Sequence, residues 1–378
     1  MKRSGLYIHI PFCLRKCNYC DFISYDYNHE LAEEFLLALF SEFKLLKERY
    51  DSPQLDTVYF GGGTPTCLSG EELARILEEV ANTFSIAEGA EITCEMNPAT
   101  GLKEDLEVMK EAGFNRLSIG VQAFDDETLN YLGRVHNLEQ ILETYRLARQ
   151  VGFDNINLDL IFAIPGQTKE GWRKSLKEVL RLNPEHLSLY NLKIEEDTPF
   201  YRMLEADELE PADEDIEYWM YKEAIDMLEE AGFEHYEISN FARPGHRSRH
   251  NMGYWQYKPY LAAGPAAHGF DGKRRYYNLS HLEDYRDHLA KGRLPWVEEL
   301  ELSQQEQMEE YLFMGLRVVD GIDITDFEKR FGKSIYQIYG DRIKKLINRQ
   351  LLQLNDNRLS LTPEGFFLGN EVFAEFLL

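Results

Sequence analysis

Three cysteines near one end of the chain have the spacing of a ligand set. Cys13, Cys17 and Cys20 follow the pattern C-x3-C-x2-C within IHIPFCLRKCNYCDF, residues 8–22. A structural zinc site needs four ligands, normally two pairs, and the other two cysteines, Cys67 and Cys94, stand singly. Three thiolates can instead hold three corners of a cubane iron–sulfur cluster and leave one iron open. The spacing therefore favours an iron–sulfur site, with zinc or chance clustering as the alternatives.

Polar residues recur at the carboxyl ends of six predicted strands. The strands are the β-rich runs at residues 6–10, 57–60, 90–96, 116–122, 156–162 and 186–192. The cysteine loop follows the first strand, and the glycine-rich stretch FGGGTPT follows the second, where backbone N–H groups can approach a ligand. Glu95, Gln122, Asp159 and Tyr190 lie late in the other four. Because the carboxyl ends of parallel strands meet at one edge, we expect these groups to form one site.

The elements that must position this site alternate along the first part of the chain. Helical patterns separate the strands up to about residue 240, which predicts a parallel sheet with right-handed crossovers. Two of these helical stretches end at Gly113 and Gly152, which are expected C-terminal stops. Six strand–helix units are fewer than the eight of a closed barrel. We therefore predict an α/β fold with an open, three-quarter parallel β/α barrel.

Three regions are expected along the chain. Residues 1–240 should form the partial barrel. Residues 241–300, rich in Gly, Pro, His and aromatic side chains without a clear period, should form a loop-rich segment packed on the barrel. Residues 301–378 contain three short helical patterns and then two small strands, an order that predicts a small C-terminal winged-helix-like domain.

The composition argues against two classes of function. The 378 residues include 41 basic and 66 acidic side chains, and the net charge of −25 repels phosphate backbones, so we expect no nucleic-acid partner. The chain contains neither a long apolar run nor a signal-peptide pattern, so we expect no membrane span, while peripheral contact with a membrane stays open. Clustered thiols that bind metal are typical of a reducing compartment, and we expect a cytoplasmic protein.

Several motifs together resemble one protein family. The stretches are YIHIPFCLRKCNYCDF, FGGGTPT, EMNP at residues 95–98, GVQAFDDETLNYLGR at 120–134 and NLDLIFAIPGQT at 157–168. In this pattern the chain is similar to the radical S-adenosylmethionine superfamily, and within it to the coproporphyrinogen III dehydrogenase-related group. The resemblance covers nearly the whole chain, and the cysteine motif is its most specific part.

The resemblance implies roles for individual residues. Cys13, Cys17 and Cys20 would bind a 4Fe-4S cluster whose open iron is chelated by S-adenosylmethionine. The residues implied to contact that cofactor are Tyr7 at its border, Gly62, Gly63 and Thr64 at its methionyl portion, and Glu95, Gln122, Arg134 and Asp159 at its remaining polar groups. In the wider family the cluster reduces the sulfonium by one electron and a 5′-deoxyadenosyl radical forms, while the protein orients the reactants and excludes water and oxygen.

Phe22 separates two functions within that group. The dehydrogenases look like C-x3-C-x2-C-x-C after an N-terminal extension, whereas this chain has Phe22 at the last position and six residues before Tyr7. Both departures, together with HNMGYW at residues 250–255, resemble the HemW-like branch, which is implied to be a haem chaperone serving haem-accepting proteins, respiratory ones among them. The alternative function is oxygen-independent coproporphyrinogen III dehydrogenation through a 5′-deoxyadenosyl radical.

A basic island adjoins that last motif. Residues 243–250, RPGHRSRH, carry three arginines and two histidines in a strongly acidic chain. Arginine pairs well with carboxylates such as haem propionates, and neutral histidine is a common axial ligand of haem iron. We favour His250 as that ligand over His246 or His268, and expect Tyr254 and Trp255 to cover a porphyrin face. An exposed loop with satisfied histidines is the competing interpretation.

Overall fold

The fold is built around a sheet whose centre consists of parallel strands. A computed structural model describes residues 3–377. Its central strands, in spatial order, are β1 (Arg3–Ile10), β4 (Gln54–Gly62), β5 (Ser85–Met96), β6 (Arg116–Gln122), β7 (Ile156–Phe162) and β8 (His186–Asn191). Each pairs in parallel with the next. All six predicted strands are therefore confirmed, in the predicted arrangement.

The sheet continues beyond this parallel centre at both ends. On one side β11 (Tyr260–Ala263) pairs in parallel with β1, and β12 (His268–Phe270), β13 (Arg274–Asn278) and β14 (Trp296–Glu301) follow antiparallel. On the other side β10 (Asn240–Ala242) and β9 (Glu234–Glu237) pair antiparallel beyond β8. Within residues 3–377 the edge strands β14 and β9 do not pair with each other, so the sheet is open.

The segment 241–300 is more regular than its composition predicts. It contributes most of β10, four further strands of the sheet and two helices, α9 (Arg249–Trp255) and α10 (Leu282–Ala290). Strands of three to six residues among glycines and aromatic residues are too short to display a period, so only pairing with the sheet reveals them. The division of the chain at 240 and 300 stays a proposal.

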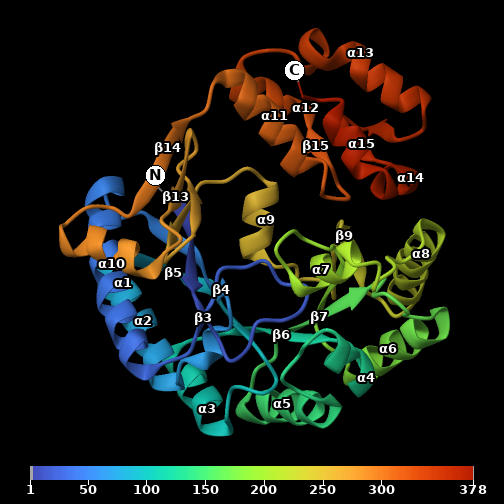
Figure 1. The fold of residues 1–378 in the computed structure, drawn as a ribbon. Coiled ribbons are helices and arrows are strands. Elements are labelled where there is room, and N and C mark those ends of the chain that lie inside the picture. Colours follow the sequence, from blue (N-terminus) through green and yellow to red (C-terminus); the bar gives the residue numbers. More distant parts are fainter. Residues whose placement is uncertain (1–2, 378) are drawn as a thin grey trace.

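Helices cover the outer side of the curved sheet, as Figure 1 shows. The long ones are α1 (His29–Tyr50), α2 (Gly70–Thr83), α3 (Lys103–Ala112), α5 (Leu138–Val151), α6 (Lys169–Leu182) and α8 (Glu214–Glu230), and the short ones are η1 (Pro65–Cys67), α4 (Asp126–Tyr131) and α7 (Pro199–Glu205). Gly113 and Gly152 end α3 and α5 with φ of 113° and 99°, a left-handed conformation that favours glycine. Both predicted helix stops are confirmed.

The alternation of side chains along the strands separates the core from the site. Leu6, Ile8, Val58 and Phe60 are fully buried between the sheet and its outer helices. The intervening residues of the same strands, such as Tyr7 and Tyr59, lie on the opposite side. Because successive strand residues face opposite ways, the apolar set packs under the helices and the polar set lines the interior of the curve.

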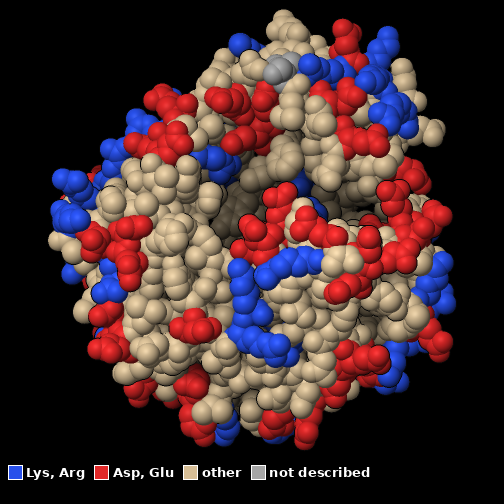
Figure 2. Space-filling model, in the orientation of Figure 1, with Lys and Arg blue, Asp and Glu red and all other residues tan. Residues whose placement is uncertain are grey.

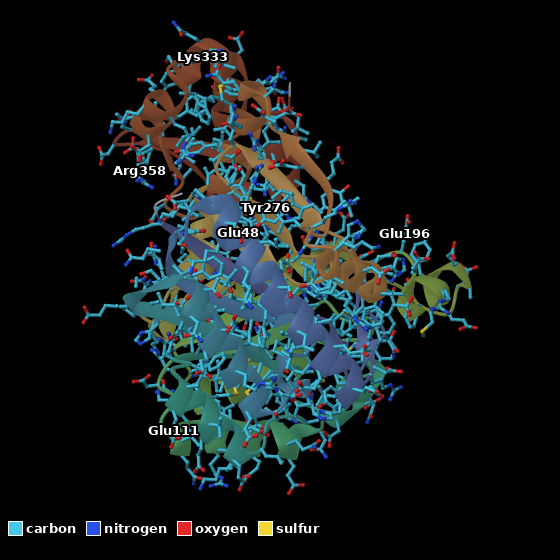
Figure 3. All side chains as sticks on the ribbon, turned by 90° about the vertical axis from the view of Figure 1, so that its left-hand side faces the viewer. Glu48, Glu111, Glu196, Tyr276, Lys333 and Arg358 are labelled. Atoms are coloured by element: carbon cyan, nitrogen blue, oxygen red, sulfur yellow. The ribbon has the colours of Figure 1, made fainter. Side chains whose placement is uncertain are left out.

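The C-terminal residues form a domain around a second core, which Tyr257 and Phe270 of the preceding segment also enter. Its elements are α11 (Gln304–Gly315), β15 (Ile322–Asp323), α12 (Ile324–Phe331), α13 (Ile335–Asn348), β16 (Leu352–Asn355), β17 (Arg358–Leu361), α14 (Pro363–Phe367) and α15 (Gly369–Ala374). Three helices followed by the β16–β17 hairpin confirm the winged-helix-like order. Figure 3 shows this domain, marked by Lys333 and Arg358, at the opposite end of the molecule from Glu111 on the barrel. No helix in the described range 3–377 has the length and apolar character to cross a membrane.

Candidate functional site

The cysteine loop is fixed to the barrel at its base and at its middle. Strands β2 (Phe12–Cys13) and β3 (Tyr25–Asp26) pair in parallel and close the base of the loop. At its middle, Asn18 donates through its backbone N–H to the Leu132 carbonyl at 3.0 Å and through Nδ2 to the Tyr131 carbonyl at 2.8 Å. The loop therefore closes on itself at its base, while its middle is held by a segment more than a hundred residues further along the chain.

The three cysteine thiols lie close enough to influence one another. All three are free and partly exposed. Burial raises the pKa of the Cys20 thiol to about 11, and the nearby Cys17 and Cys13 contribute to that rise. Within the described residues, no three His, Cys, Asp or Glu side chains converge on a single ion. A cubane cluster takes one thiolate per iron at separate corners, so it does not require such convergence. The donor set fits a cluster better than a single metal ion.

Gly62, Gly63 and Thr64 lie against the cysteine loop. A Cβ at Gly63 would meet the Phe12 carbonyl oxygen at 2.6 Å and the Cys13 Sγ at 3.0 Å, so only glycine allows this approach. The Thr64 Oγ1 lies 3.7 Å from the same sulfur, and the Thr64 N–H donates to the Phe12 carbonyl at 2.7 Å. The predicted proximity of the glycine-rich stretch to the cysteines is confirmed.

Glu95 provides a carboxyl group beside these glycines. It accepts hydrogen bonds from the Tyr59 hydroxyl at 2.7 Å and from the Gly62 N–H at 3.3 Å. The pKa of Glu95 is raised to about 7, chiefly by burial and to a lesser extent by the nearby Asp159, against the lowering effect of the two hydrogen bonds and of Arg116. Tyr7 borders the same carboxyl, since its pKa is raised by burial and then by Glu95. A carboxyl group whose pKa is near 7 loses its proton, and so becomes negatively charged, when a cationic group binds beside it.

Gln122 and Arg134 connect the end of β6 to the cysteine loop. Pairing between β6 and β7 shifts register between Gly120 and Gln122, and Gln122 has a φ of 67°. This bulge turns the Gln122 side chain back over Gly120, where an added Cβ would meet its Nε2 at 2.9 Å. Arg134 donates to the Gly120 carbonyl at 2.8 Å and to the Cys17 Sγ at 3.4 Å. The structure therefore brings these two residues together with the cysteines.

Asp159 and Tyr190 belong to a second polar cluster in the interior. Asp159 accepts from Asn157 Nδ2 at 2.8 Å and from Ser118 Oγ at 3.3 Å, and burial raises its pKa. Tyr190 is 43% exposed as a whole residue, but its hydroxyl is shielded from solvent, and this burial and then Asp159 raise its pKa. Asp159 also acts on the pKa of Glu95. This cluster adjoins the Glu95 group, but the protein already provides hydrogen-bond donors to Asp159.

His250 is a buried, fully bonded residue of the barrel interior. Its Nδ1 lies 2.7 Å from the Thr57 Oγ1 and its Nε2 lies 2.7 Å from the Tyr254 hydroxyl. Its ring stacks on that of Tyr59 with centroids 5.0 Å apart, and burial lowers its pKa to about 3. Since both ring nitrogens have partners, neither is available to haem iron in this conformation. The structure does not support the prediction that His250 is the axial ligand.

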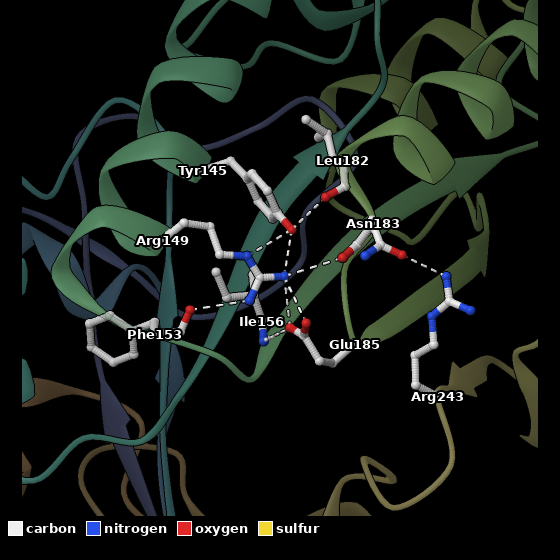
Figure 4. A network of polar contacts seen from close by, with 8 residues as sticks. All are labelled: Tyr145, Arg149, Phe153, Ile156, Leu182, Asn183, Glu185 and Arg243. Carbon is white, nitrogen blue, oxygen red and sulfur yellow. Dashed lines mark hydrogen bonds and ion pairs between the residues drawn. The ribbon is translucent and has the colours of Figure 1, made fainter.

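The basic island at residues 243–250 is likewise occupied by protein partners. Arg243 donates to the Asn183 Oδ1 at 2.7 Å, and Figure 4 shows this bond at the edge of the network around Arg149 and Glu185. Arg247 forms ion pairs with Glu234 at 3.0 Å and Asp320 at 3.1 Å. The third arginine, Arg249, donates to the Gly89 carbonyl at 2.6 Å. All three arginines therefore have protein partners, Arg247 alone an anionic one, and their pairing with haem propionates stays a prediction.

Tyr59, which connects Glu95 to His250, was missed in the sequence analysis. Tyr59 donates to Glu95 and stacks on His250, and it also stacks on Tyr7 with centroids 6.2 Å apart. The available signal was its position, two residues from Thr57 and two from Gly61 on β4, because alternate strand residues share a face. Beyond this position, the sequence around a single tyrosine in a predicted strand does not indicate which side chains it contacts.

Comparisons with known proteins show the family to which the chain belongs. A family model described as "Radical SAM superfamily" matches residues 7–179, and one described as "HemN C-terminal domain" matches residues 302–368. The chain is 37% identical to heme chaperone HemW of Bacillus subtilis over 98% of both chains. It is 36% identical to heme chaperone HemW of Lactococcus lactis, over 100% of this chain and 98% of that one.

A solved structure shares the fold along the whole chain. It is that of coproporphyrinogen III oxidase (HemN) from Escherichia coli, a radical SAM enzyme. The TM-score is 0.85 over 100% of this chain and 90% of that one, with 23% sequence identity. At that identity the likeness concerns the fold: an α/β radical SAM fold with a parallel sheet, followed by the C-terminal domain.

Proposed function

Because the chain belongs to the HemW-like branch of the radical SAM superfamily, we propose that it is a haem chaperone, which binds haem and delivers it to haem-accepting proteins. The observation that carries this proposal is the similarity to proteins named heme chaperone HemW over 98% or more of the chains compared. Phe22 supports it, because it stands where the dehydrogenase pattern has a fourth cysteine, and its side chain is 59% exposed.

The residues of the candidate site fit a 4Fe-4S cluster held by Cys13, Cys17 and Cys20. Support comes from the three free thiols on a loop fixed at base and middle, and from the close approach that Gly63 allows. When bound, such a cluster supplies single electrons. The Arg134 guanidinium, which donates to Cys17, would stabilise the negative charge of the coordinated thiolates.

S-adenosylmethionine is the second group that these residues fit. Gly62, Gly63 and Thr64 offer backbone beside the cysteine loop, and Tyr7 and Glu95 adjoin them. Glu95 would pair with a cationic group of the cofactor, since its carboxyl has a pKa of about 7 and would ionise as that group binds. Gln122 and Arg134, which both lie at Gly120, would provide hydrogen-bond donors to the cofactor. Asp159 would act through the polar cluster that adjoins Glu95.

Two assays on the same anaerobically reconstituted protein test the function. In the first, haemin is titrated and the Soret band recorded, and the loaded protein is then mixed with an apo-haemoprotein. A chaperone should bind haemin with a band distinct from that of free haemin and should transfer it. In the second, coproporphyrinogen III is added with S-adenosylmethionine and a reductant, with a genuine dehydrogenase as the positive control. We expect the substrate to stay unchanged. Its conversion to protoporphyrinogen IX, or a lack of haemin binding, would contradict the chaperone function.

A further inference from the structure

Arg317 lies where the C-terminal domain meets the barrel. It follows α11, and its backbone carbonyl accepts from the Ile238 N–H at 3.1 Å. The adjacent Val318 forms a β-bridge with Glu237, and the Val319 N–H donates to the Tyr236 carbonyl at 3.0 Å. The backbone around Arg317 is thereby tied to strand β9 of the large sheet. Its side chain therefore has a defined position at the junction of the two domains.

The guanidinium of Arg317 has aromatic neighbours but no anionic partner. It lies over the rings of Trp255, Phe313 and Phe373, at 4.9, 5.6 and 5.9 Å from their centroids. Its Nε is buried without a hydrogen-bond partner, and no ion pair joins it to any residue between 3 and 377. A partly buried cation without an anion pays a desolvation cost that an incoming anion can offset.

The acidic group that acts electrostatically on Arg317 does not fill this role. Glu237 acts electrostatically on Arg317, yet the two form no ion pair. The Glu237 carboxylate instead accepts from the Ser239 N–H at 3.2 Å and from the Asn240 side chain. Burial lowers the pKa of Arg317, whereas every other described arginine whose pKa is displaced has it raised. These observations indicate that the Arg317 guanidinium has no anionic partner among the described residues and could accept one from a ligand.

Apolar surface is exposed around this cation. Phe313 is 41% exposed, and Trp255 is half-buried with an indole N–H that has no partner. Trp255 ends α9, and α9 contacts α11. Figure 2 shows the molecular surface hollowed between the C-terminal domain and the barrel, at the place where Figure 1 shows α9. Flat aromatic rings and a single free cation suit a flat apolar ligand that carries a carboxylate.

We propose that Arg317 binds a propionate carboxylate of haem, with the porphyrin face against Trp255 and Phe313. This inference rests on the proposed function and assigns the place of the ligand. Two features make the assignment selective: the chain has a net charge of −25, and of the island arginines Arg247 is ion-paired while the other two already donate to neutral protein groups, whereas the Arg317 side chain has neither kind of partner among residues 3–377. A dianionic porphyrin therefore needs a cation that the protein has left unpaired, and Arg317 meets that condition.

The test compares haemin with haemin dimethyl ester, in which both propionates are neutral. The protein carries its reconstituted cluster, and each ligand is titrated into wild type, Arg317→Met, Arg317→Lys and Arg247→Met. A charge-assisted bond to one carboxylate corresponds to about tenfold in affinity. We expect Arg317→Met to weaken haemin binding about tenfold and leave ester binding unchanged, and Arg317→Lys to retain most of the preference. Arg247→Met, which removes an arginine paired with Glu234 and Asp320, is the matched control and should alter neither affinity.

The outcomes distinguish a failure of the Arg317 assignment from a failure of the proposed chaperone function. If wild type binds haemin but Arg317→Met keeps the full preference for haemin over the ester, the assignment of Arg317 is wrong and the chaperone function stands. An equal loss for both ligands would also overturn it, because it would indicate a structural role at the junction. Far-ultraviolet circular dichroism and cluster absorbance identify a misfolded variant. If wild type binds neither ligand, both the inference and the proposed function fail.

Discussion

Glu95→Gln removes the charge of the site carboxyl while keeping its shape. Burial raises the pKa of Glu95 from 4.5 to about 7. The folded protein therefore holds this proton more tightly than the unfolded chain does. As the pH rises from about 4.5 through 7, the unfolded state ionises first, and the free energy of unfolding falls. Glutamine carries no ionisable proton, so the variant should escape this loss.

The size of the effect follows from the two pKa values. Each pH unit between them is worth about 1.36 kcal/mol, so wild type should lose at most about 2 kcal/mol through Glu95 between about pH 5.5 and 8. The amide has one acceptor oxygen for two donors, the Tyr59 hydroxyl and the Gly62 N–H. The variant should therefore also carry a cost of about 1 kcal/mol that does not depend on pH.

Urea denaturation of the cluster-free protein, followed by circular dichroism at both pH values, measures this difference. Glu42→Gln is the matched control: Glu42 is fully buried with a pKa of about 7, and its bonds come from Gly264, Asn278 and Tyr285 outside the site. Both variants should lose less stability than wild type as the pH rises. Only Glu95→Gln should weaken S-adenosylmethionine binding to the reconstituted protein, by about tenfold for one charge-assisted contact. A pH dependence of Glu95→Gln as steep as that of wild type would refute the reasoning from burial.

Two further predictions follow from the thiols and from His250. Replacing Cys13, Cys17 or Cys20 by Ala should abolish the 4Fe-4S absorbance of the reconstituted protein, while Cys67→Ala and Cys94→Ala should retain it, and cluster loss in either of the latter would overturn the ligand assignment. His250→Ala should lower stability by roughly 2–4 kcal/mol, because it leaves the Thr57 and Tyr254 hydroxyls unpaired and removes the stacking on Tyr59, yet it should leave the Soret band of bound haem unchanged. A displaced band would restore His250 as an iron ligand.

The local patterns of the sequence were sufficient for the architecture of the barrel, whereas the role of the three cysteines as cluster ligands stays a prediction. The six parallel strands appear as short β-rich runs, and helix ends are marked by residues such as Gly113 and Gly152, because period and capping are properties of neighbouring residues. The polar strand ends lie along one edge of the sheet, since parallel pairing brings the carboxyl ends there, and that they form a single site stays a prediction. The short strands of the segment 241–300 escaped prediction because they exist only through pairing with a sheet already formed.

Which charged and ring groups are free was decided by the tertiary structure alone. His250 looked like an open ligand in the motif HNMGYW, but the fold places Thr57, 193 residues away in the sequence, within hydrogen-bond distance of its ring. Arg247 looked free within a basic run, but Glu234 and Asp320 reach it from two other elements. Arg317 has no distinctive sequence context, yet packing against Trp255 and Phe313 leaves it without an anion. Sequence determines which groups can bind, and the contacts between distant segments determine which of them the protein has already used.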